Sequence, residues 1–526
     1  MNRDHALEQI HETQQPWDLI VVGGGSTGLG VALDAVSRGF QVLLLEQADF
    51  AKGTSSRSTK LVHGGVRYLA QGDVFLVLEA LKERGRLLKN APHVTKNQSF
   101  VIPIYTWFDR LQYTVGLKLY DWLAGGLSLG RSHFVNRKKA ISLIPTIKTE
   151  GLKGGVIYQD GQFDDARLAL NIAQTCEAKG STMLNYARVQ GLLKDDSGKV
   201  NGVAFEDVET GETFEVQGKA VFNATGVFVD DLLQMDQPAK KKMIRPSQGV
   251  HLVLDRSFLP GDHAIMIPKT SDGRVLFCVP WHDKIVVGTT DTLREDPELE
   301  PKALEKEIEF ILETARAYLT KKPQRSDVLS VFAGLRPLAA PQEEGKSTKE
   351  ISRSHKVLVS DSGLITITGG KWTTFRKMGE DAVDMAIKKG MLPQANSASA
   401  HLRIHGFHPN PDLSNPRYVY GSDEEIIVQL AAEHSDWAEP IHPKYPYLKA
   451  QVIFAVREEM ARTVEDVLSR RMRVLLQDAD AAKDMAPEVA RLMAQEMGKD
   501  QTWIEQQVAH FGQLANNYHI QVASSR

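Results

Sequence analysis

Cysteine is scarce in this chain of 526 residues, which contains only Cys176 and Cys278. Two cysteines cannot form a disulfide framework, and such scarcity is typical of a reducing compartment. The formal net charge is only −3, which gives no indication of a nucleic-acid-binding protein. No apolar run reaches the roughly 18 residues that a membrane-spanning helix needs, and the polar N-terminus MNRDHALEQIHETQQ does not resemble a secretory signal. We therefore expect a protein that is soluble or lies on a membrane surface.

The overall composition is that of a globular protein, with 42% hydrophobic and 25% charged residues. The length suggests about three units of roughly 150 residues, or one large α/β domain with inserts. Beyond about residue 395, proline, asparagine and serine become frequent, as in a linker, and the remainder has mostly helical patterns. We expect one unit over residues 1–395 and a mostly helical C-terminal domain over 396–526.

The first apolar run, WDLIVV at residues 17–22, ends at a cluster of glycines. Apolar residues then recur at helical spacing in LGVALDAVSRGF, where Gly39 suits a helix C-cap. Residues 41–46, QVLLLE, have the pattern of a second buried strand. The order strand, glycine turn, helix, strand predicts a parallel βαβ unit.

Residues 23–28, GGGSTG, match the pattern G-x-G-x-x-G at the turn of this unit. Gly23 allows the tight turn, Gly25 allows a pyrophosphate to approach the backbone, and Gly28 allows close packing of helix and strand. Glu46 ends the next strand at the distance expected of the acid that binds the ribose. A purely structural turn is the alternative, but the context favours FAD or NAD, and the acid disfavours NADP.

The later sequence alternates between helical and extended patterns. Helices are expected at 69–88 and 164–179, short strands over 181–222, and antiparallel strands over 250–291 with a turn at 281–284. From residue 365, ITITGGKWTTFRKM predicts a strand, a glycine turn and a helix. We expect an α/β fold with a doubly wound nucleotide domain and an antiparallel sheet.

Six motifs in order resemble those of the FAD-dependent, quinone-linked (aerobic) glycerol-3-phosphate dehydrogenases. They are DLIVVGGGSTGLG, FAKGTSSRSTKLVHGGVRYL, NATG at 223–226, GTTD at 288–291, GLRPL at 334–338 and TGGKWTTFRKM at 368–378. The resemblance implies the fold of the D-amino-acid-oxidase-like flavoproteins, in which an FAD domain is interleaved with a substrate-binding sheet. It also implies FAD and oxidation of sn-glycerol 3-phosphate to dihydroxyacetone phosphate. Cys176 and Cys278 lie outside the segments expected to contact the flavin, so covalent attachment is not indicated.

The glycine loop and the resemblance together give a set of expected site residues. Expected cofactor ligands are Gly23, Gly25, Ser26, Thr27, Gly28, Glu46, Thr54, Ser55, Ser56, Lys60, Leu61, Gly64, Gly226, Gly334, Gly370, Lys371, Trp372 and Thr373. Expected substrate ligands are Arg67, Tyr68, Thr289, Arg336, Arg353 and Lys371. Expected catalytic residues are His63, His251, Arg336 and Lys371, and no metal site is expected.

The three arginines suit a substrate phosphate because the guanidinium fork donates two parallel hydrogen bonds. Each of them could instead be a structural ion-pair partner. Lys371 begins a helix, so it could lie near the flavin N1–O2 edge, where negative charge develops. His63 and His251 are equal candidates for the base that takes the hydroxyl proton, and His251 could instead be a core histidine.

Residues 107–139 combine aromatic side chains with basic ones, including Arg137, Lys138 and Lys139. This composition suits an anchor at an anionic membrane surface, where a quinone would accept the electrons. An amphipathic helix packed on the core is the alternative. We expect a peripheral protein on the cytoplasmic face of the cell membrane, and a homodimer is one option for its assembly.

Other classes of protein remain open at this point. An oxygen-dependent glycerol-3-phosphate oxidase would share the same site and differ only in its electron acceptor. A non-catalytic flavin-binding protein would be expected to lack the arginines and the lysine, which are all present. An FAD-dependent amine oxidase would share the fold, but an amine substrate would not require three arginines.

Overall fold

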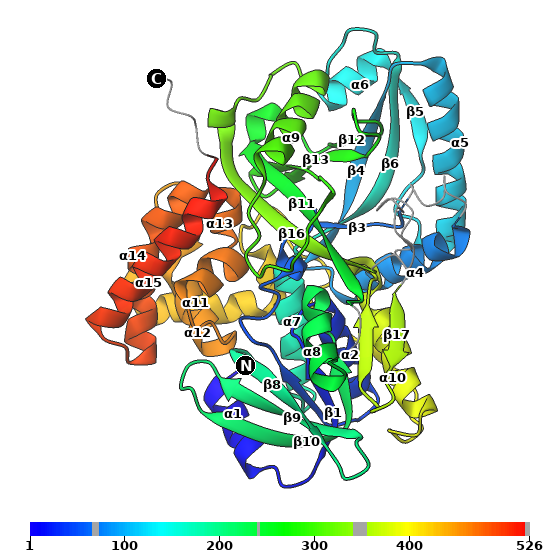
Figure 1. Cartoon of the computed structure of the whole chain (residues 1–526). Helices are drawn as coiled ribbons and strands as arrows, with labels where there is room; N and C mark the ends of the chain where they lie inside the picture. Colours follow the sequence, from blue (N-terminus) through cyan, green and yellow to red (C-terminus); the bar gives the residue numbers. More distant parts are fainter. Residues whose placement is uncertain (66–72, 239–241, 340–354, 521–526) are drawn as a thin grey trace.

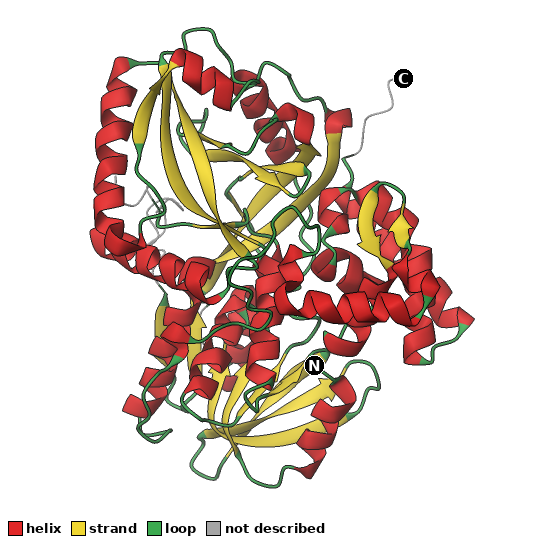
Figure 2. Ribbon diagram, turned by 180° about the vertical axis from the view of Figure 1, so that it is seen from behind, coloured by secondary structure: helices red, strands yellow, loops and turns green. Residues whose placement is uncertain are grey.

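The computed structural model describes residues 1–65, 73–238, 242–339 and 355–520. Two sheets form the centre of the molecule, and a group of C-terminal helices lies beside both of them (Figure 1). Figure 2 shows the same arrangement from behind, with the sheets in two separate bodies and the helices around them. None of the helices in these ranges is long and apolar enough to cross a membrane.

The first sheet is the nucleotide-binding sheet. Its strand order is β17–β18–β10–β1–β2–β7, with β8 and β9 joined as a hairpin extension of β10. The strands are β1 (Trp17–Val22), β2 (Val42–Leu45), β7 (Thr182–Leu184), β8 (Ala187–Lys194), β9 (Val200–Asp207), β10 (Thr213–Asn223), β17 (Lys356–Val359) and β18 (Ile365–Thr368). β1 pairs in parallel with both β2 and β10, which confirms the expected βαβ unit.

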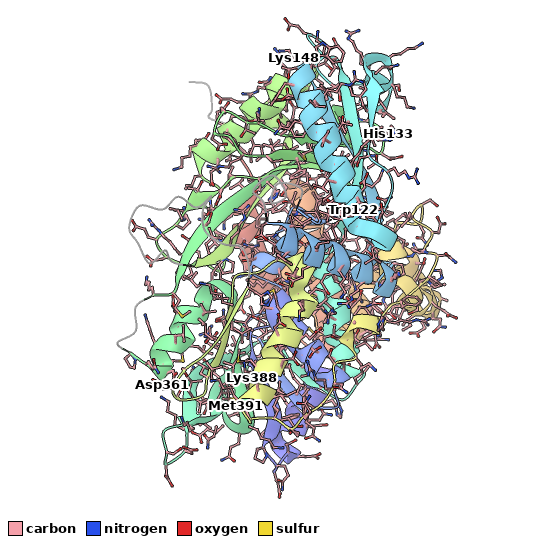
Figure 3. The ribbon with its side chains drawn as sticks, turned by 90° about the vertical axis from the view of Figure 1, so that its right-hand side faces the viewer. Trp122, His133, Lys148, Asp361, Lys388 and Met391 are labelled. Atoms are coloured by element: carbon pink, nitrogen blue, oxygen red, sulfur yellow. The ribbon has the colours of Figure 1, made fainter. Side chains whose placement is uncertain are left out.

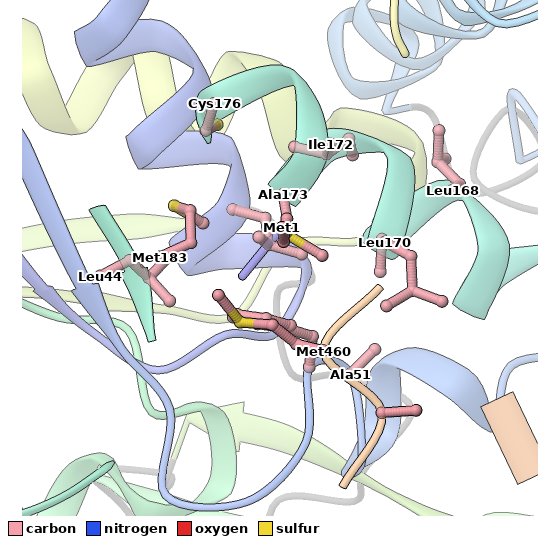
Figure 4. Close-up of a cluster of buried hydrophobic side chains, with 14 of the residues drawn as sticks. Met1, Leu44, Ala51, Leu168, Leu170, Ile172, Ala173, Cys176, Met183 and Met460 are labelled. Carbon is pink, nitrogen blue, oxygen red and sulfur yellow. The ribbon is translucent and has the colours of Figure 1, made fainter. Parts of the chain in front are cut away.

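Helices cover both faces of this sheet, as their apolar sequences predict. They are α1 (Arg3–Glu12), α2 (Ser26–Ser37), α7 (Asp165–Glu177), α8 (Val229–Asp236) and α10 (Phe375–Lys388). α7 is buried along nearly its whole length, because it lies between the sheet and the C-terminal region. In Figure 4, Met460 of the C-terminal region lies in the same apolar cluster as Met183 and the α7 side chains.

The second sheet is largely antiparallel and runs β15–β11–β14–β13–β12–β4–β6–β3, with β16 paired to β11 and β5 paired to β6. Its strands are β3 (Leu61–Val62), β4 (Thr95–Ile104), β5 (His133–Asn136), β6 (Gly154–Phe163), β11 (Ile244–Asp255), β12 (Ala264–Ile267), β13 (Leu276–Trp281), β14 (Lys284–Gly288), β15 (Thr292–Leu293) and β16 (Val328–Ala339). The hairpin expected at residues 281–284 joins β13 to β14. This sheet has its own apolar core under α6 (Arg137–Leu143) and α9 (Glu305–Tyr318). The two sheets together confirm the expected fold class.

Two helices flank the second sheet on the side away from the C-terminal region (Figure 1). α4 (Val74–Asn90) begins where Asp73 caps the amide of Leu76, and it ends just before Pro92. The helix expected at 69–88 therefore corresponds to α4, although residues 69–72 lie outside the described part of the chain. α5 (Trp107–Ala124) is capped by Thr106 and ends at Gly125, whose φ is +50°.

The C-terminal region is mostly helical, as its sequence pattern predicts. It contains α11 (Glu424–Glu433), α12 (Lys449–Glu458), α13 (Val474–Gln477), α14 (Ala479–Met497), α15 (Gln501–Ala515) and the hairpin β19–β20 (Pro440–His442, Tyr445–Leu448). Its buried side chains belong to the same apolar cluster as the nucleotide-binding sheet. The domain boundary at residue 395 remains a prediction.

Candidate functional site

A cavity of about 2230 Å³ lies between the two sheets, and the glycine loop forms one end of it. Gly23 has a φ of +111°, and a Cβ on Gly28 would lie 1.8 Å from the Gly23 carbonyl oxygen. α2 can therefore begin directly against β1 only with glycine at these positions. Gly23, Gly25, Ser26 and Thr27 line the cavity, so the start of α2 faces the space that a pyrophosphate would occupy.

Glu46 follows β2 and lines the cavity beside this loop. Its carboxylate accepts hydrogen bonds from the amides of Gly24 at 2.6 Å and Ala48 at 3.0 Å. Burial raises the pKa of Glu46, and these two hydrogen bonds oppose the rise. The carboxylate is thus fixed at the position where the βαβ motif expects a ribose-binding acid.

Residues 53–61 form the wall next to the glycine loop. The expected ligands Thr54, Ser55 and Leu61 line the cavity. Arg57, Ser58 and Thr59, which were not among the individual ligands expected, line it too. This stretch of the motif FAKGTSSRSTKLVHGGVRYL is rich in hydroxyl and basic residues. The short 3-10 helix η1 (Thr54–Ser56) decides which side chains of this stretch face the cavity. No periodicity in the sequence reveals this helix.

Lys60, an expected cofactor ligand, is fully buried and points away from the cavity. Its Nζ donates to the carbonyl of Ser56 at 2.7 Å and to Asp165 Oδ2 at 2.6 Å. Asp165 also accepts from Arg473 of the C-terminal region at 2.7 Å. Lys60 and Ser56 therefore stabilise the 53–61 segment from the side that faces away from the cavity, and neither side chain lines the cavity.

Arg336 on β16 lies at the other end of the cavity. Its Nη1 donates to the carbonyl of Thr290 and its Nη2 to Thr289 Oγ1, both at 3.1 Å. A Cβ on Gly249 of the neighbouring strand β11 would lie 2.4 Å from Nη2, so only glycine leaves room for this guanidinium. The arginine and Thr289 are held together as one polar group on the cavity wall, and their role as substrate ligands stays a prediction.

His251 on β11 lies close to this group. Its ring stacks on Phe332, and its Nε2 lies 2.9 Å from Thr59 Oγ1. Burial, and then the charges of Lys60 and Arg336, hold the pKa of His251 well below its usual range. His251 is therefore neutral at physiological pH, and Thr59 connects it to the loop that faces the cofactor space.

His63 and Lys371 line the same cavity from other segments. The His63 amide donates to Thr373 Oγ1 at 3.3 Å. Lys371 is the N-cap of the short helix η6 (Trp372–Thr374), which leads into α10. Trp372 donates from its indole nitrogen to the carbonyl of Ser55 at 2.8 Å, which joins this helix start to the 53–61 wall.

The structure thus brings most of the expected residues to one cavity. Among the remaining expected cofactor ligands, those that line it are Gly226, Gly334, Gly370, Trp372 and Thr373. Gly28 and Gly64 lie next to the cavity and support its walls. Arg67, Tyr68 and Arg353 lie outside the described residues.

α5 also lines the cavity, which its sequence did not suggest. Leu111, Val115 and Leu119 face the cavity rim and are also 65%, 58% and 44% exposed. The rim is therefore continuous with an apolar outer surface. A helix pattern shows that one face is apolar, but it does not show that a cavity opens there.

The fold and the cavity define an FAD-dependent oxidoreductase of the D-amino-acid-oxidase-like class. A family model described as "FAD dependent oxidoreductase" matches residues 18–376, and "C-terminal domain of alpha-glycerophosphate oxidase" matches residues 399–504. FAD is the cofactor, and the glycine cradle, the fixed Glu46 carboxylate and the hydroxyl-rich wall fit it.

Relatives narrow the family further. The probable mitochondrial glycerol-3-phosphate dehydrogenase of Caenorhabditis elegans is 40% identical, covering 92% of this chain and 71% of that protein. The mitochondrial glycerol-3-phosphate dehydrogenase of Arabidopsis thaliana is 39% identical, with coverages of 94% and 85%. The structure of the Bacillus halodurans glycerol-3-phosphate dehydrogenase complexed with FAD superimposes with a TM-score of 0.80 at 31% identity, covering 99% of this chain and 98% of the other. The chain belongs to the FAD-dependent glycerol-3-phosphate dehydrogenase family.

Proposed function

We propose that the protein oxidises sn-glycerol 3-phosphate to dihydroxyacetone phosphate and passes the electrons to a membrane quinone. The observation that carries the oxidation is the group formed by Arg336, Thr289 and His251, which faces the same cavity as the glycine loop. A substrate phosphate suits the Arg336 guanidinium, which lies 3.8 Å from the Asp291 carboxylate, and the C2 carbon of the substrate would then extend toward the cofactor space.

In this reaction the C2 carbon loses a hydride and the C2 hydroxyl loses a proton, which leaves a carbonyl. FAD, when bound, supplies the hydride acceptor. Arg336 binds and orients the phosphate, with Arg67 and Arg353 as further proposed ligands. Either His63 or His251 takes the proton, and Lys371 stabilises negative charge at the start of η6.

The experiment is anaerobic mixing of the FAD-loaded protein with glycerol 3-phosphate while the flavin absorbance is followed. Bleaching by glycerol 3-phosphate and much slower bleaching by glycerol would support the proposal. An unchanged spectrum would contradict it and favour a non-catalytic flavin-binding protein.

The proposed membrane site is the outer surface of α5, which we call the apolar face. It consists of Trp107, Phe108, Leu111, Val115, Leu119 and Trp122, which are 44–76% exposed. In Figure 3, α5 runs along the outside of the molecule and carries Trp122. Large exposed aromatic and aliphatic side chains on one helix are typical of an interfacial anchor.

The cavity rim supports a quinone as acceptor, because Leu111, Val115 and Leu119 belong both to the rim and to the apolar face. A quinone dissolved in the bilayer could then reach the cavity without crossing water. Arg137, Lys138 and Lys139 are exposed on α6, and Arg110 stacks on Trp107 within the apolar face. These charges would add attraction to anionic lipids.

Oxygen is the alternative acceptor, favoured by the match of residues 399–504 to the oxidase C-terminal model. Turnover measured with a quinone analogue under nitrogen, and then with oxygen alone, separates the two acceptors. Faster turnover with oxygen would replace the quinone part of the proposal and leave the oxidation step in place.

A further inference from the structure

The inner side of α5 is buried and polar at one point. Leu117, Tyr120 and Ala124 are the buried residues of this helix, and Tyr120 is only 1% exposed. An apolar residue would suffice if this position only packed against the core, so the buried hydroxyl calls for an explanation.

The Tyr120 hydroxyl joins three elements. It accepts a hydrogen bond from the Gly64 amide at 2.8 Å and donates to Asp160 Oδ2 on β6 at 2.9 Å. The other oxygen of Asp160 accepts from Arg84 of α4 at 2.8 Å. The hydroxyl therefore has both a donor and an acceptor partner, and a charged, fully buried pair fixes its direction.

Gly64 lies directly on this support. A Cβ at this position would be 2.5 Å from the Tyr120 hydroxyl oxygen and 2.5 Å from Leu81 Cδ2 of α4. The backbone of residue 64 can thus approach α4 and α5 only because it has no side chain. The neighbours His63 and Gly65 both line the cavity.

His63 is held from the opposite direction. Its amide donates to Thr373 Oγ1 at 3.3 Å, and that hydroxyl donates back to the His63 carbonyl at 3.4 Å. The segment 63–64 is therefore bound between η6, which begins at the proposed flavin edge, and α5, which carries the apolar face. The Tyr120 hydroxyl is the hydrogen-bonding group through which a shift of α5 against β6 would reach Gly64 and its neighbour His63.

We propose that Tyr120 is a positioning residue that holds Gly64, and with it His63, at the wall of the cavity. In this role Tyr120 also couples the binding of α5 to a membrane with the oxidation of the substrate. The coupling rests on the membrane role proposed above, whereas the positioning rests only on the proposed oxidation. The two sides of α5 then have different roles: the apolar face contacts lipid, and the buried side with Tyr120 positions His63 at the cavity.

The test compares Tyr120→Phe with Tyr420→Phe, each loaded with FAD in detergent. Tyr420 is the matched control, because it is 2% exposed, accepts a hydrogen bond from Gln451 at 3.0 Å and does not line the cavity. We expect similar losses of thermal stability and full FAD content in both variants. Only Tyr120→Phe should slow flavin reduction by saturating glycerol 3-phosphate, by about tenfold.

Asp160→Asn is the second variant, in case Tyr120→Phe retains too little FAD. It preserves the size of the side chain and removes the charge that orients the hydroxyl, so reduction should again be slower. Reduction at the parent rate in FAD-loaded Tyr120→Phe would overturn the proposal, because that variant lacks the hydrogen bond to the Gly64 amide. If Tyr120→Phe retains too little FAD, the parent rate in Asp160→Asn overturns it, because the hydroxyl has then lost its charged acceptor.

The second part of the test adds vesicles of phosphatidylcholine and phosphatidylglycerol. Vesicles should increase the reduction rate of the parent and of Tyr420→Phe, but not that of Tyr120→Phe. An equal response in all three proteins would overturn the coupling. If the parent does not bind vesicles at all, the membrane role fails, while the detergent comparison still decides the positioning.

Discussion

The cavity is bounded by two regions of opposite character. On the C-terminal side, the buried Asp165 carboxylate accepts hydrogen bonds from Lys60 and Arg473, and both of these side chains also donate to the Ser56 carbonyl. On the α5 side, apolar side chains face outward without cover from other described residues. The first region fixes the loop that faces the cofactor, and the second leaves the rim accessible. The difference indicates that the site must be rigid where the cofactor binds and open where a second reactant arrives.

The largest effect is expected on the rigid side. Arg473→Ala removes one of the cations that bind the buried Asp165 carboxylate, which costs at most about 3–5 kcal/mol of stability because Lys60 still binds it. We expect a lower denaturant midpoint and loss of FAD during gel filtration. Arg491→Ala is the control, because that side chain is 47% exposed and its pair with Glu488 contributes under about 1 kcal/mol. Equal behaviour of the two variants would show that the buried charges do not fix the loop.

Arg336→Ala tests whether this arginine of the cavity wall binds the substrate phosphate. Loss of a charge-assisted pair should remove about 2–4 kcal/mol of transition-state stabilisation, which lowers kcat/KM for glycerol 3-phosphate by roughly 30- to 1000-fold. The value for unphosphorylated glycerol should change much less. If both substrates lose activity equally, Arg336 is not a phosphate ligand. Arg325→Ala, on an exposed ion pair with Glu305, is the matched control.

On the open side, replacing Trp107 and Trp122 together by Ala should weaken vesicle binding by about 2–3 kcal/mol at low and high salt alike. The two side chains are 61% and 76% exposed, so the thermal midpoint should not fall. Co-sedimentation with vesicles measures the binding. A fall of the midpoint together with unchanged binding would show that these side chains pack within the protein.

Replacing Arg137, Lys138 and Lys139 by Ala should weaken binding to anionic vesicles by at most about 1 kcal/mol per residue at low salt, and by less at high salt. Flavin reduction in detergent should be unchanged, because these residues do not line the cavity. Turnover with a quinone embedded in vesicles should fall. If the triple variant binds anionic vesicles as tightly as the parent at every salt concentration, the basic residues do not contribute, and the proposed anchor is reduced to the apolar face.

The smallest effect concerns pH and the choice of base. The pKa of His251 is held below its ordinary 6.5, so its neutral, proton-accepting form persists as pH falls through that value. If His251 is the base, the rate of flavin reduction should not decline between pH 8 and about 6.5. Stopped-flow reduction over this range is the measurement. A decline near neutral pH that disappears in His63→Ala would assign the proton to His63.

The features that could be predicted from the sequence are those whose geometry depends on residues close together in the chain. The glycine loop, Glu46 and the strand before Lys371 lie within short units whose geometry follows from local pattern, and the six motifs indicated the family. The direction of Lys60 could not be predicted, because its partner Asp165 is 105 positions away. The position of α5 at the cavity rim was missed for a similar reason, since helical periodicity does not say what lies next to a helix.

Arg473 and Ser56, which share a hydrogen bond, are 417 positions apart in the chain. A ribosome must therefore translate most of the message, and Arg473 must leave the exit tunnel, before the cofactor loop can acquire this support. Chains stalled before Arg473 should not retain FAD, whereas released chains should. Cofactor capture would then mark the completion of synthesis, so a truncated product would remain colourless and exposed to proteolysis.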